Sequence, residues 1–216
     1  MVLRNQQCAG KGYGSRVVCY RCFKPQVACV CESIEPVANR TGIIVLQHPR
    51  ERFHAIGTVR IARLGLQNVR VEQCSQWADS SVIQEQLPER SALLYPTANA
   101  RELSSLPIEE HPRHLIVLDG TWFHTKKIYD AHQWLHHLPH VSLTPSEPSR
   151  YRIRPEPRRS YVATLEAIVY ALRVIEPQTA GLDALLRSFA AMVDWQAAYT
   201  PAAAAAEWES FGEPVV

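Results

Sequence analysis

The chain has 216 residues, of which 46% are hydrophobic, and this length favours one substantial domain with a small appendage over two full-sized domains. Its formal net charge of +2 is too small to make the whole surface polyanion-binding, so composition alone identifies no nucleic-acid partner. No apolar segment approaches the ~18–20 residues that cross a bilayer, and the first residues lack the hydrophobic region of a signal peptide. We therefore expect a soluble cytoplasmic protein without a membrane partner.

Four cysteines near the start have the spacing of a metal site. They form a CxxC pair and a CxC pair at Cys19, Cys22, Cys29 and Cys31. Zinc prefers four tetrahedral sulfur or nitrogen ligands, and a lobe with almost no core needs a cross-link to order it. The pattern predicts structural Zn²⁺ in an N-terminal lobe of residues 1–40, with reduced, metal-free cysteines as the alternative. Cys8 stays open as a replacement ligand, whereas Cys74 is interpreted as a core residue.

From Thr41 onward, short aliphatic runs alternate with helical patterns. Strands separated by helices predict an α/β domain over 41–216, with a mostly parallel sheet covered on both faces. The runs that predict strands are 43–46, 69–71, 92–95, 115–118 and 141–143. The segments that predict helices are 55–66, 80–86, 121–131, 161–173 and 182–199, with a last one starting at 202.

The aliphatic run 115–118 ends directly on Asp119-Gly-Thr-Trp122. Gly120 permits a tight turn into the next helix, and carboxyl ends of parallel strands are where ligands usually bind in open α/β sheets. The functional interpretation makes Asp119 a ligand-binding or catalytic carboxylate. The structural alternative is that Asp119 or Thr121 caps the helix and Trp122 fills the core.

Unusual loops also follow the other predicted strands, at 48–51 (His-Pro-Arg-Glu), at 96–98 (Pro-Thr-Ala) and after 143. Because these strand ends share one edge of a parallel sheet, we expect a common pocket there. The sequence has no GxGxxG after the first strand, no GxxxxGK[ST] and no GxSxG, so dinucleotide, P-loop and nucleophile-elbow sites are not supported.

The loop over 146–159 is rich in proline and carries five arginines between 150 and 159. Guanidinium groups make paired bonds to phosphate or carboxylate, so a fixed array of them predicts anion or RNA binding. The alternative is a solvated loop whose arginines pair with Glu147 and Glu156. In the amphipathic helix that follows, Glu166 would orient an arginine or a ligand amine, or else be an exposed first-turn carboxylate.

Several of these blocks together resemble the DTW-domain family, specifically the bacterial tRNA-uridine aminocarboxypropyltransferases. The resemblance covers most of the chain. It rests on the four cysteines, 48–51, 58–60 (Thr-Val-Arg), 118–122 with Lys127, 148–157 (PSRYRIRPEP) and 164–167 (Thr-Leu-Glu-Ala).

The resemblance implies a SPOUT-like fold with a C-terminal knot and S-adenosylmethionine as co-substrate. The 3-amino-3-carboxypropyl group would be transferred to N3 of a uridine in tRNA, position 47 being the usual bacterial site, with release of methylthioadenosine. Two alternatives stay open. One is a SPOUT-like RNA methyltransferase, and the other is a non-enzymatic, zinc-stapled RNA-binding module.

The resemblance also suggests roles for individual residues. Asp119 would be the general base for uracil N3, with a pKa raised by burial, or would bind the ammonium of the transferred chain. Trp122 would pack on adenine or on the target base at the catalytic centre. The cofactor pocket would use Leu94, Pro96, Thr97, Leu118, Gly120, Thr121, Ser149, Tyr151, Arg154, Thr164 and Glu166. The tRNA backbone would meet Arg60, Lys127, Arg150, Arg152 and Arg158.

Overall fold

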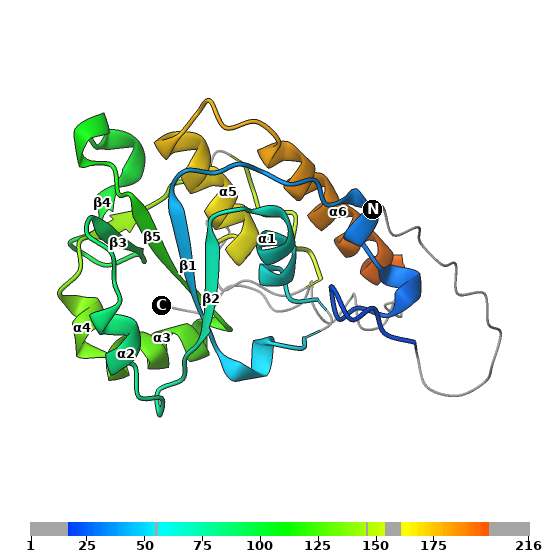
Figure 1. The fold of residues 1–216 in the computed structure, drawn as a ribbon, viewed down its shortest axis with the longest axis horizontal. Helices are drawn as coiled ribbons and strands as arrows, with labels where there is room; N and C mark the ends of the chain where they lie inside the picture. Colours follow the sequence, from blue (N-terminus) through cyan, green and yellow to red (C-terminus); the bar gives the residue numbers. More distant parts are fainter. Residues whose placement is uncertain (1–16, 55, 146, 154–160, 199–216) are drawn as a thin grey trace, which may run out of the picture.

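The fold was analysed in a computed structural model that describes residues 17–54, 56–145, 147–153 and 161–198. One parallel sheet forms its centre, with the strand order β2-β1-β5-β3-β6-β4. Helices cover both faces of this sheet, which confirms the predicted α/β class (Figure 1). The strands are β1 (Gly42–Gln47), β2 (Val69–Gln73), β3 (Ser91–Leu94), β4 (Arg101–Glu102), β5 (His114–Asp119) and β6 (His140–Ser142).

Side chains alternate along the central strands between two apolar cores. Ile43 and Val45 of β1 belong to one core, and Ile44 and Leu46 belong to the other. The first core lies under α1, α5 and α6, and the second lies under α2, α3 and α4 (Figure 1). The helices are α1 (Val59–Gly65), α2 (Ser81–Glu85), α3 (Trp122–Ala131), α4 (Gln133–His136), α5 (Thr164–Ile175) and α6 (Leu182–Ala198).

Helices α1 and α5 start later in the chain than the sequence predicted, because the loops before them form structure of their own. A 3-10 helix, Pro49–Glu51, follows β1, and α1 starts only at Val59. Helix α5 starts at Thr164 because the carboxylate of Glu166 accepts the N–H of Ala163 at 2.8 Å and so caps the helix there. Strand β4 and helix α4 were not predicted. The remaining 3-10 helices are Gln26–Ala28, Cys31–Ser33, Leu103–Ser105 and Ile108–Glu110.

The sheet has a topological switch point between β1 and β5. After β1 the chain continues into α1 on one face, and after β5 it continues into α3 on the opposite face. These two strands are neighbours, and Gln47 pairs in register with Asp119 at their carboxyl ends. Connections that leave to opposite faces open a crevice at the strand ends, and this is where ligands bind in such sheets.

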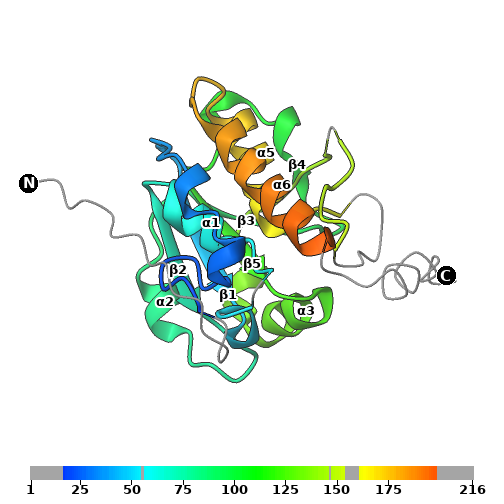
Figure 2. The ribbon, with the colours of Figure 1, turned by 90° about the vertical axis from the view of Figure 1, so that its right-hand side faces the viewer.

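The N-terminal segment packs beside α1 and α6 (Figures 1 and 2). Val30 and Val37 are buried in the core that α5 and α6 cover, and the hydroxyl of Ser33 donates to Ser188 of α6 at 2.9 Å. The segment therefore shares a core with the sheet, and a separate lobe ending at residue 40 stays a prediction. The SPOUT-type knot likewise stays a prediction.

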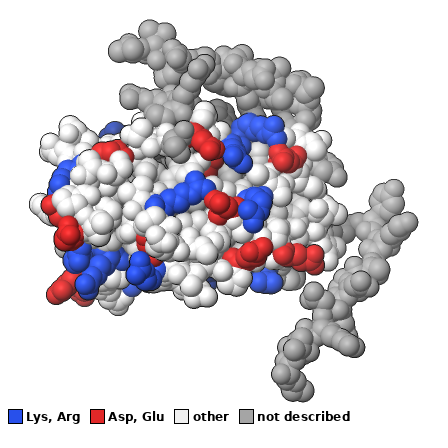
Figure 3. Space-filling view, turned by 90° about the horizontal axis from the view of Figure 1, so that it is seen from above, with Lys and Arg blue, Asp and Glu red and all other residues white. Residues whose placement is uncertain are grey.

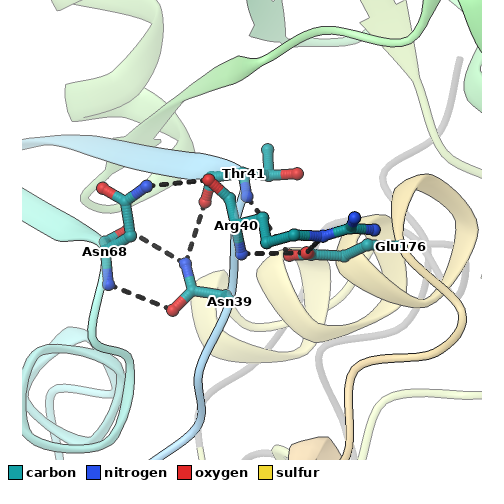
Figure 4. A network of polar contacts seen from close by, with 5 residues as sticks. All are labelled: Asn39, Arg40, Thr41, Asn68 and Glu176. Atoms are coloured by element: carbon teal, nitrogen blue, oxygen red, sulfur yellow. Dashed lines mark hydrogen bonds and ion pairs between the residues drawn. The ribbon is translucent and has the colours of Figure 1, made fainter.

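A polar network fixes the amino-terminal edge of the sheet (Figure 4). The buried carboxylate of Glu176, at the end of α5, accepts the N–H of Arg40 at 2.9 Å and that of Thr41 at 3.4 Å. Asn39 donates to the carbonyl groups of Thr41 and Asn68 at 2.8 and 3.0 Å. These bonds satisfy backbone groups that precede β1 and β2, and they tie both strands to α5.

The face seen from above Figure 1, which lies at the amino ends of the strands, carries basic and acidic side chains in alternation (Figure 3). Among the side chains coloured there, no patch of a single sign covers this face. In the part of the chain that the structure describes, no helix is both long enough and apolar enough to span a bilayer.

Candidate functional site

A cavity of about 580 Å³ opens at the carboxyl ends of the central strands. Its volume lies within the ~300–1,000 Å³ of small-molecule sites. Leu94, Val117 and Leu118 supply apolar wall from the strands, and Thr164 and Ala167 supply wall from the start of α5. The expected common pocket at the strand ends is therefore present.

Asp119 ends β5 on the wall of this cavity and is buried. Thr164 donates its hydroxyl to Asp119 Oδ1 at 2.7 Å, and the amide of Gln47 donates to Asp119 Oδ2 at 2.9 Å. Gln73 in turn donates to Gln47 Oε1 at 3.1 Å. The ends of three neighbouring strands and the first residue of α5 thus hold one carboxylate in a fixed orientation.

The residues after Asp119 form a compact turn into α3. A Cβ on Gly120 would lie 3.0 Å from Cβ of His124, so this turn leaves little room for a side chain at position 120. Thr121 is the N-cap of α3, and its Oγ1 accepts the N–H of His124 at 3.2 Å. Trp122 is half-buried on the cavity wall, with its ring centroid 3.8 Å from that of Tyr161. Thr121 therefore caps the helix and also lines the cavity.

Most residues that the sequence suggested for the cofactor reach this cavity, but some do not. Thr97, Ser149 and Glu166 are not among the described residues that line it, and Arg154 lies outside the described residues. Those that line it, beside Asp119 and Trp122, are Leu94, Pro96, Leu118, Gly120, Thr121, Tyr151 and Thr164.

Glu166 holds the start of the arginine loop. Its buried carboxylate accepts the hydroxyl of Ser149 at 2.7 Å and the backbone N–H of Arg150 and Ala163, both at 2.8 Å. The carboxylate is therefore neither an exposed first-turn group nor a partner of a described guanidinium. Tyr151, next in the loop, is buried against Phe189 and donates its hydroxyl to the carbonyl of Ile56 at 2.7 Å. Both anchors bring the loop to the cavity wall.

The residues suggested for the tRNA backbone are spread over three elements. Arg60 lies on α1, with its guanidinium 4.1 Å from the ring centroid of Phe23. Lys127 lies on α3, with Nζ 4.2 Å from the ring centroid of Phe123. In the loop, Arg150 pairs with Glu147 at 3.2 Å and Arg152 pairs with Asp194 of α6. Arg158, Arg159 and Glu156 lie outside the described residues.

The four cysteines of the N-terminal segment converge. Their sulfurs all lie within 4.8 Å of one another, and the pairs Cys19–Cys31 and Cys22–Cys29 are each 3.8 Å apart. A disulfide requires about 2.05 Å, whereas a tetrahedral centre with metal–sulfur bonds of ~2.3 Å separates its sulfurs by about 3.8 Å. The cluster thus has the spacing of a four-thiolate metal site. Cys8 lies outside the described residues.

The other cysteine prediction is confirmed, since Cys74 is buried in the second core and burial raises the pKa of its thiol to about 11.

Three side chains at this site were missed by sequence reasoning. Gln47 directly precedes the His-Pro-Arg-Glu block, and its position as the last residue of β1 was the available signal. Tyr161 was assigned to a helix face, but it precedes α5 and its ring packs against that of Trp122. Tyr95 also lines the cavity, and burial raises the pKa of its hydroxyl to about 12, so it is neutral at physiological pH.

Comparisons with known proteins place the chain in a family. A family model described as DTW domain matches residues 16–197. The chain is 29% identical over 193 residues to tRNA-uridine aminocarboxypropyltransferase 2 of Macaca fascicularis, which covers 84% of this chain and 64% of the macaque protein. The protein of the same name from Drosophila melanogaster is 29% identical over 188 residues, and the match covers 82% of this chain and 74% of the fly protein.

tRNA-uridine aminocarboxypropyltransferase A of Arabidopsis thaliana is 26% identical over 221 residues, covering 85% of this chain and 82% of the plant protein. The chain thus spans less than two thirds of the macaque protein and more of the other two. No solved structure shows significant similarity to it. Because the family model matches most of its length, the chain belongs to the DTW-domain family.

Proposed function

We propose that this protein transfers the 3-amino-3-carboxypropyl group of S-adenosylmethionine to N3 of a uridine in tRNA, with position 47 as the target. The observation that carries the proposal is the buried carboxylate of Asp119 on the wall of a cavity at the strand ends. The names of the relatives in macaque, fruit fly and Arabidopsis support the same activity.

S-adenosylmethionine, when bound, supplies a sulfonium whose carbon–sulfur bond to the aminocarboxypropyl chain breaks as that chain bonds to N3, leaving methylthioadenosine. The protein must then select one of three carbons on the sulfonium by orientation. It must also deal with the N3 proton, since a protonated uracil is a poor nucleophile. Asp119 suits either task, because its two oxygens are held by Thr164 and Gln47.

The cavity wall supplies the rest of the binding site. Leu94, Pro96 and Leu118 offer apolar surface, and Gly120 lets the backbone approach the ligand. Trp122, which packs against Tyr161 at a tilt of 30°, offers a flat face to adenine or to the target base. We assign Glu166 and Ser149 to positioning the loop, since they bond to each other. Thr97, which follows Pro96 in the chain, and Arg154, which we assign to the carboxylate of the co-substrate, complete the proposed site.

The thiolate cluster and the arginines complete the proposal. Four thiolates at tetrahedral spacing suit structural Zn²⁺, which would order a segment that carries little core of its own. Arg60, Lys127, Arg150, Arg152 and Arg158 would contact the tRNA backbone. Reduced thiols in such a cluster suit the cytoplasm, where we place the protein.

Isotope labelling tests the reaction directly. Purified protein is incubated with tRNA and with S-adenosylmethionine that carries ¹³C in the aminocarboxypropyl chain and deuterium in the methyl group. The proposal expects a uridine that gains the ¹³C label and no deuterium in nucleoside mass spectrometry. Deuterium without ¹³C would indicate a methyltransferase. Retained tRNA binding with neither label would indicate a non-enzymatic RNA-binding module.

A further inference from the structure

Four side chains form an aromatic and cationic cluster where the cysteine segment meets the loop after β1. The rings of Phe23 and Phe53 meet edge to face, with centroids 5.1 Å apart and planes at 78°. The guanidinium of Arg60 lies 4.1 Å from the centroid of Phe23, and that of Arg52 lies 5.0 Å from the centroid of Phe53. Phe53 is 60% exposed. We call these four residues the Phe53 platform.

The backbone of Phe23 has a conformation that is unusual for a residue with a side chain. Phe23 follows Cys22 directly and has a φ of 57°, in the left-handed region that favours glycine. The turn around it is tightly bonded, since Phe23 donates its N–H to the carbonyl of Cys19 at 2.7 Å. Strained non-glycine residues persist mostly where the side chain is needed for function. The ring of Phe23 supports Phe53 and Arg60, which gives the strain a reason.

The Phe53 platform borders the candidate active site. A second cavity, of about 380 Å³, is lined by Arg52, His54, Arg60 and Arg63, and it shares Glu51 and Gly57 with the first cavity. Glu72 also lines it, but Glu72 is paired with Arg70 at 3.3 Å. Three arginines and two carboxylates therefore line a cavity that adjoins the first one, and the exposed Phe53 follows Arg52 directly in the chain.

This combination fits single-stranded RNA better than a protein partner. Aromatic faces interleaved with arginines bind RNA by stacking a base and contacting its phosphate. Chemistry at N3 requires that the target uridine leave its neighbours and enter the first cavity. The adjacent nucleotide then loses a stacking partner, and the exposed ring of Phe53 stands between Arg52 and His54, which line the neighbouring cavity.

We propose that the Phe53 platform stacks a nucleotide next to the target uridine, so that the cysteine segment takes part in positioning the tRNA. This inference rests on the proposed function, because it takes tRNA as the substrate. It assigns Phe53 and Phe23 to RNA recognition, and it makes the metal cluster a support for that recognition through Phe23.

The test compares tRNA affinities of Phe53→Ala, Phe53→Leu and Phe53→Trp with that of the full-length wild-type protein. We expect Phe53→Ala and Phe53→Leu to weaken binding by about 5- to 150-fold, the range of one lost base–aromatic stack, and Phe53→Trp to bind like wild type. The salt dependence of binding should stay unchanged in all three, since no charge is removed. Arg52→Gln should make that dependence shallower.

Two further variants exclude simpler explanations. Ile108→Ala removes an exposed apolar side chain from a 3-10 helix before β5, and it should leave tRNA affinity unchanged. Phe23→Gly relaxes the left-handed backbone, so it should keep the metal content while tRNA affinity falls. Wild-type affinity in Phe53→Ala or in Phe53→Leu would overturn the inference, the latter because leucine keeps apolar contact without stacking.

The failure of this inference is separable from that of the proposed function, because the modified nucleoside is identified independently by its mass. If the wild-type protein makes aminocarboxypropyl-uridine and Phe53→Ala binds tRNA with wild-type affinity, the proposed function is supported and the role of the Phe53 platform is excluded. If the wild-type protein makes no such nucleoside and Phe53→Ala loses tRNA affinity, the role of the Phe53 platform is supported and the proposed function is excluded.

Discussion

Thr164 opens α5 and donates a hydrogen bond of 2.7 Å to Asp119, the last residue of β5. The helix that follows the arginine loop therefore positions the carboxylate at the end of the central strand. Thr164→Val keeps the shape of the side chain and removes this bond. Because hydrogen bonds to charged groups contribute ~1.5–3 kcal/mol, we expect kcat of the transfer to fall about tenfold or more.

A second variant, Thr164→Ser, separates a positioning role of Thr164 from a purely structural one. Thr164→Ser retains the hydroxyl and should restore kcat, whereas a purely structural role would show as a lower melting temperature in both variants. Ser105→Ala removes an exposed hydroxyl that donates to the carbonyl of Glu102, and it serves as the control with unchanged kcat. Equal kcat in Thr164→Val and wild type would remove Thr164 from the mechanism.

The sheet could be predicted from the sequence because its central strands are continuous aliphatic runs. Strand β5 buries Leu115, Ile116, Val117 and Leu118, and a continuous aliphatic run of this kind is typical of a strand that a parallel sheet buries on both faces. Strand β4 could not be predicted, since Arg101–Glu102 has only two residues, both charged. Its pairing with β6 comes from tertiary position and leaves no apolar pattern.

Only those residues of the candidate site that directly follow a predicted strand could be predicted from the sequence. Asp119 follows from the pattern of an aliphatic run that stops on a carboxylate, but its partner Gln47 lies 72 residues earlier, and only the strand order β1–β5 brings them together. The sequence suggested a ligand-binding role for Glu166, because no sequence pattern predicts its contacts with the loop. Its acceptance of the backbone N–H of Arg150, in place of a guanidinium, depends on how the loop folds back.

Removal of the Glu166 carboxylate should destabilise the loop. Glu166→Ala leaves the hydroxyl of Ser149 and the N–H groups of Arg150 and Ala163 without their acceptor. Only the Ala163 donor is buried, and an unpaired buried donor costs ~1–3 kcal/mol, so we expect a loss of about 1–3 kcal/mol in the free energy of unfolding. Urea denaturation measures this. Glu166→Gln retains one acceptor oxygen and should lose less, so an equal loss in the two variants would contradict this account.

The cysteine cluster should bind one metal ion per chain. Elemental analysis of the purified protein should find about one zinc, and Cys22→Ser should lower both the zinc content and the melting temperature, because the segment around the cluster loses its cross-link. Cys74→Ala changes a buried thiol outside the cluster and should retain the zinc. Full zinc content in Cys22→Ser would show that the four thiolates are not the ligands.

Acidification should reduce stability partly through His48. Burial, together with the nearby charges of His124 and Arg50, lowers the pKa of His48 below its ordinary value of 6.5, while Glu51 acts in the opposite direction. Between the folded and unfolded pKa values the unfolded chain binds more protons, so this contribution is complete above about pH 6.5 and is lost as the pH falls through the folded pKa. The free energy of unfolding, measured from pH 7.5 to 5, should decrease.

His48→Asn tests that assignment, because an asparagine oxygen can replace Nδ1 as the acceptor of the Arg50 N–H, which now lies at 3.3 Å. The variant should lose stability less steeply with falling pH than wild type. Burial also lowers the pKa of His140, so part of the slope should persist in His48→Asn and become smaller when His140 is replaced as well. An identical slope in His48→Asn and wild type would contradict the prediction.

Asp119→Asn separates the two roles open to this carboxylate, because methylthioadenosine lacks the chain that carries the ammonium. If Asp119 binds the ammonium, the variant should bind S-adenosylmethionine at least tenfold more weakly in calorimetry and bind methylthioadenosine as wild type does. If Asp119 takes the N3 proton, both affinities should be retained while kcat falls by about 10²–10⁴, the usual contribution of a general base. The variant side chain keeps its size and can still accept from Thr164 through its amide oxygen, but its NH₂ group cannot accept from Gln47. Wild-type kcat with wild-type affinity for S-adenosylmethionine would exclude both roles, and would leave the buried carboxylate as a link between β1, β5 and α5 only.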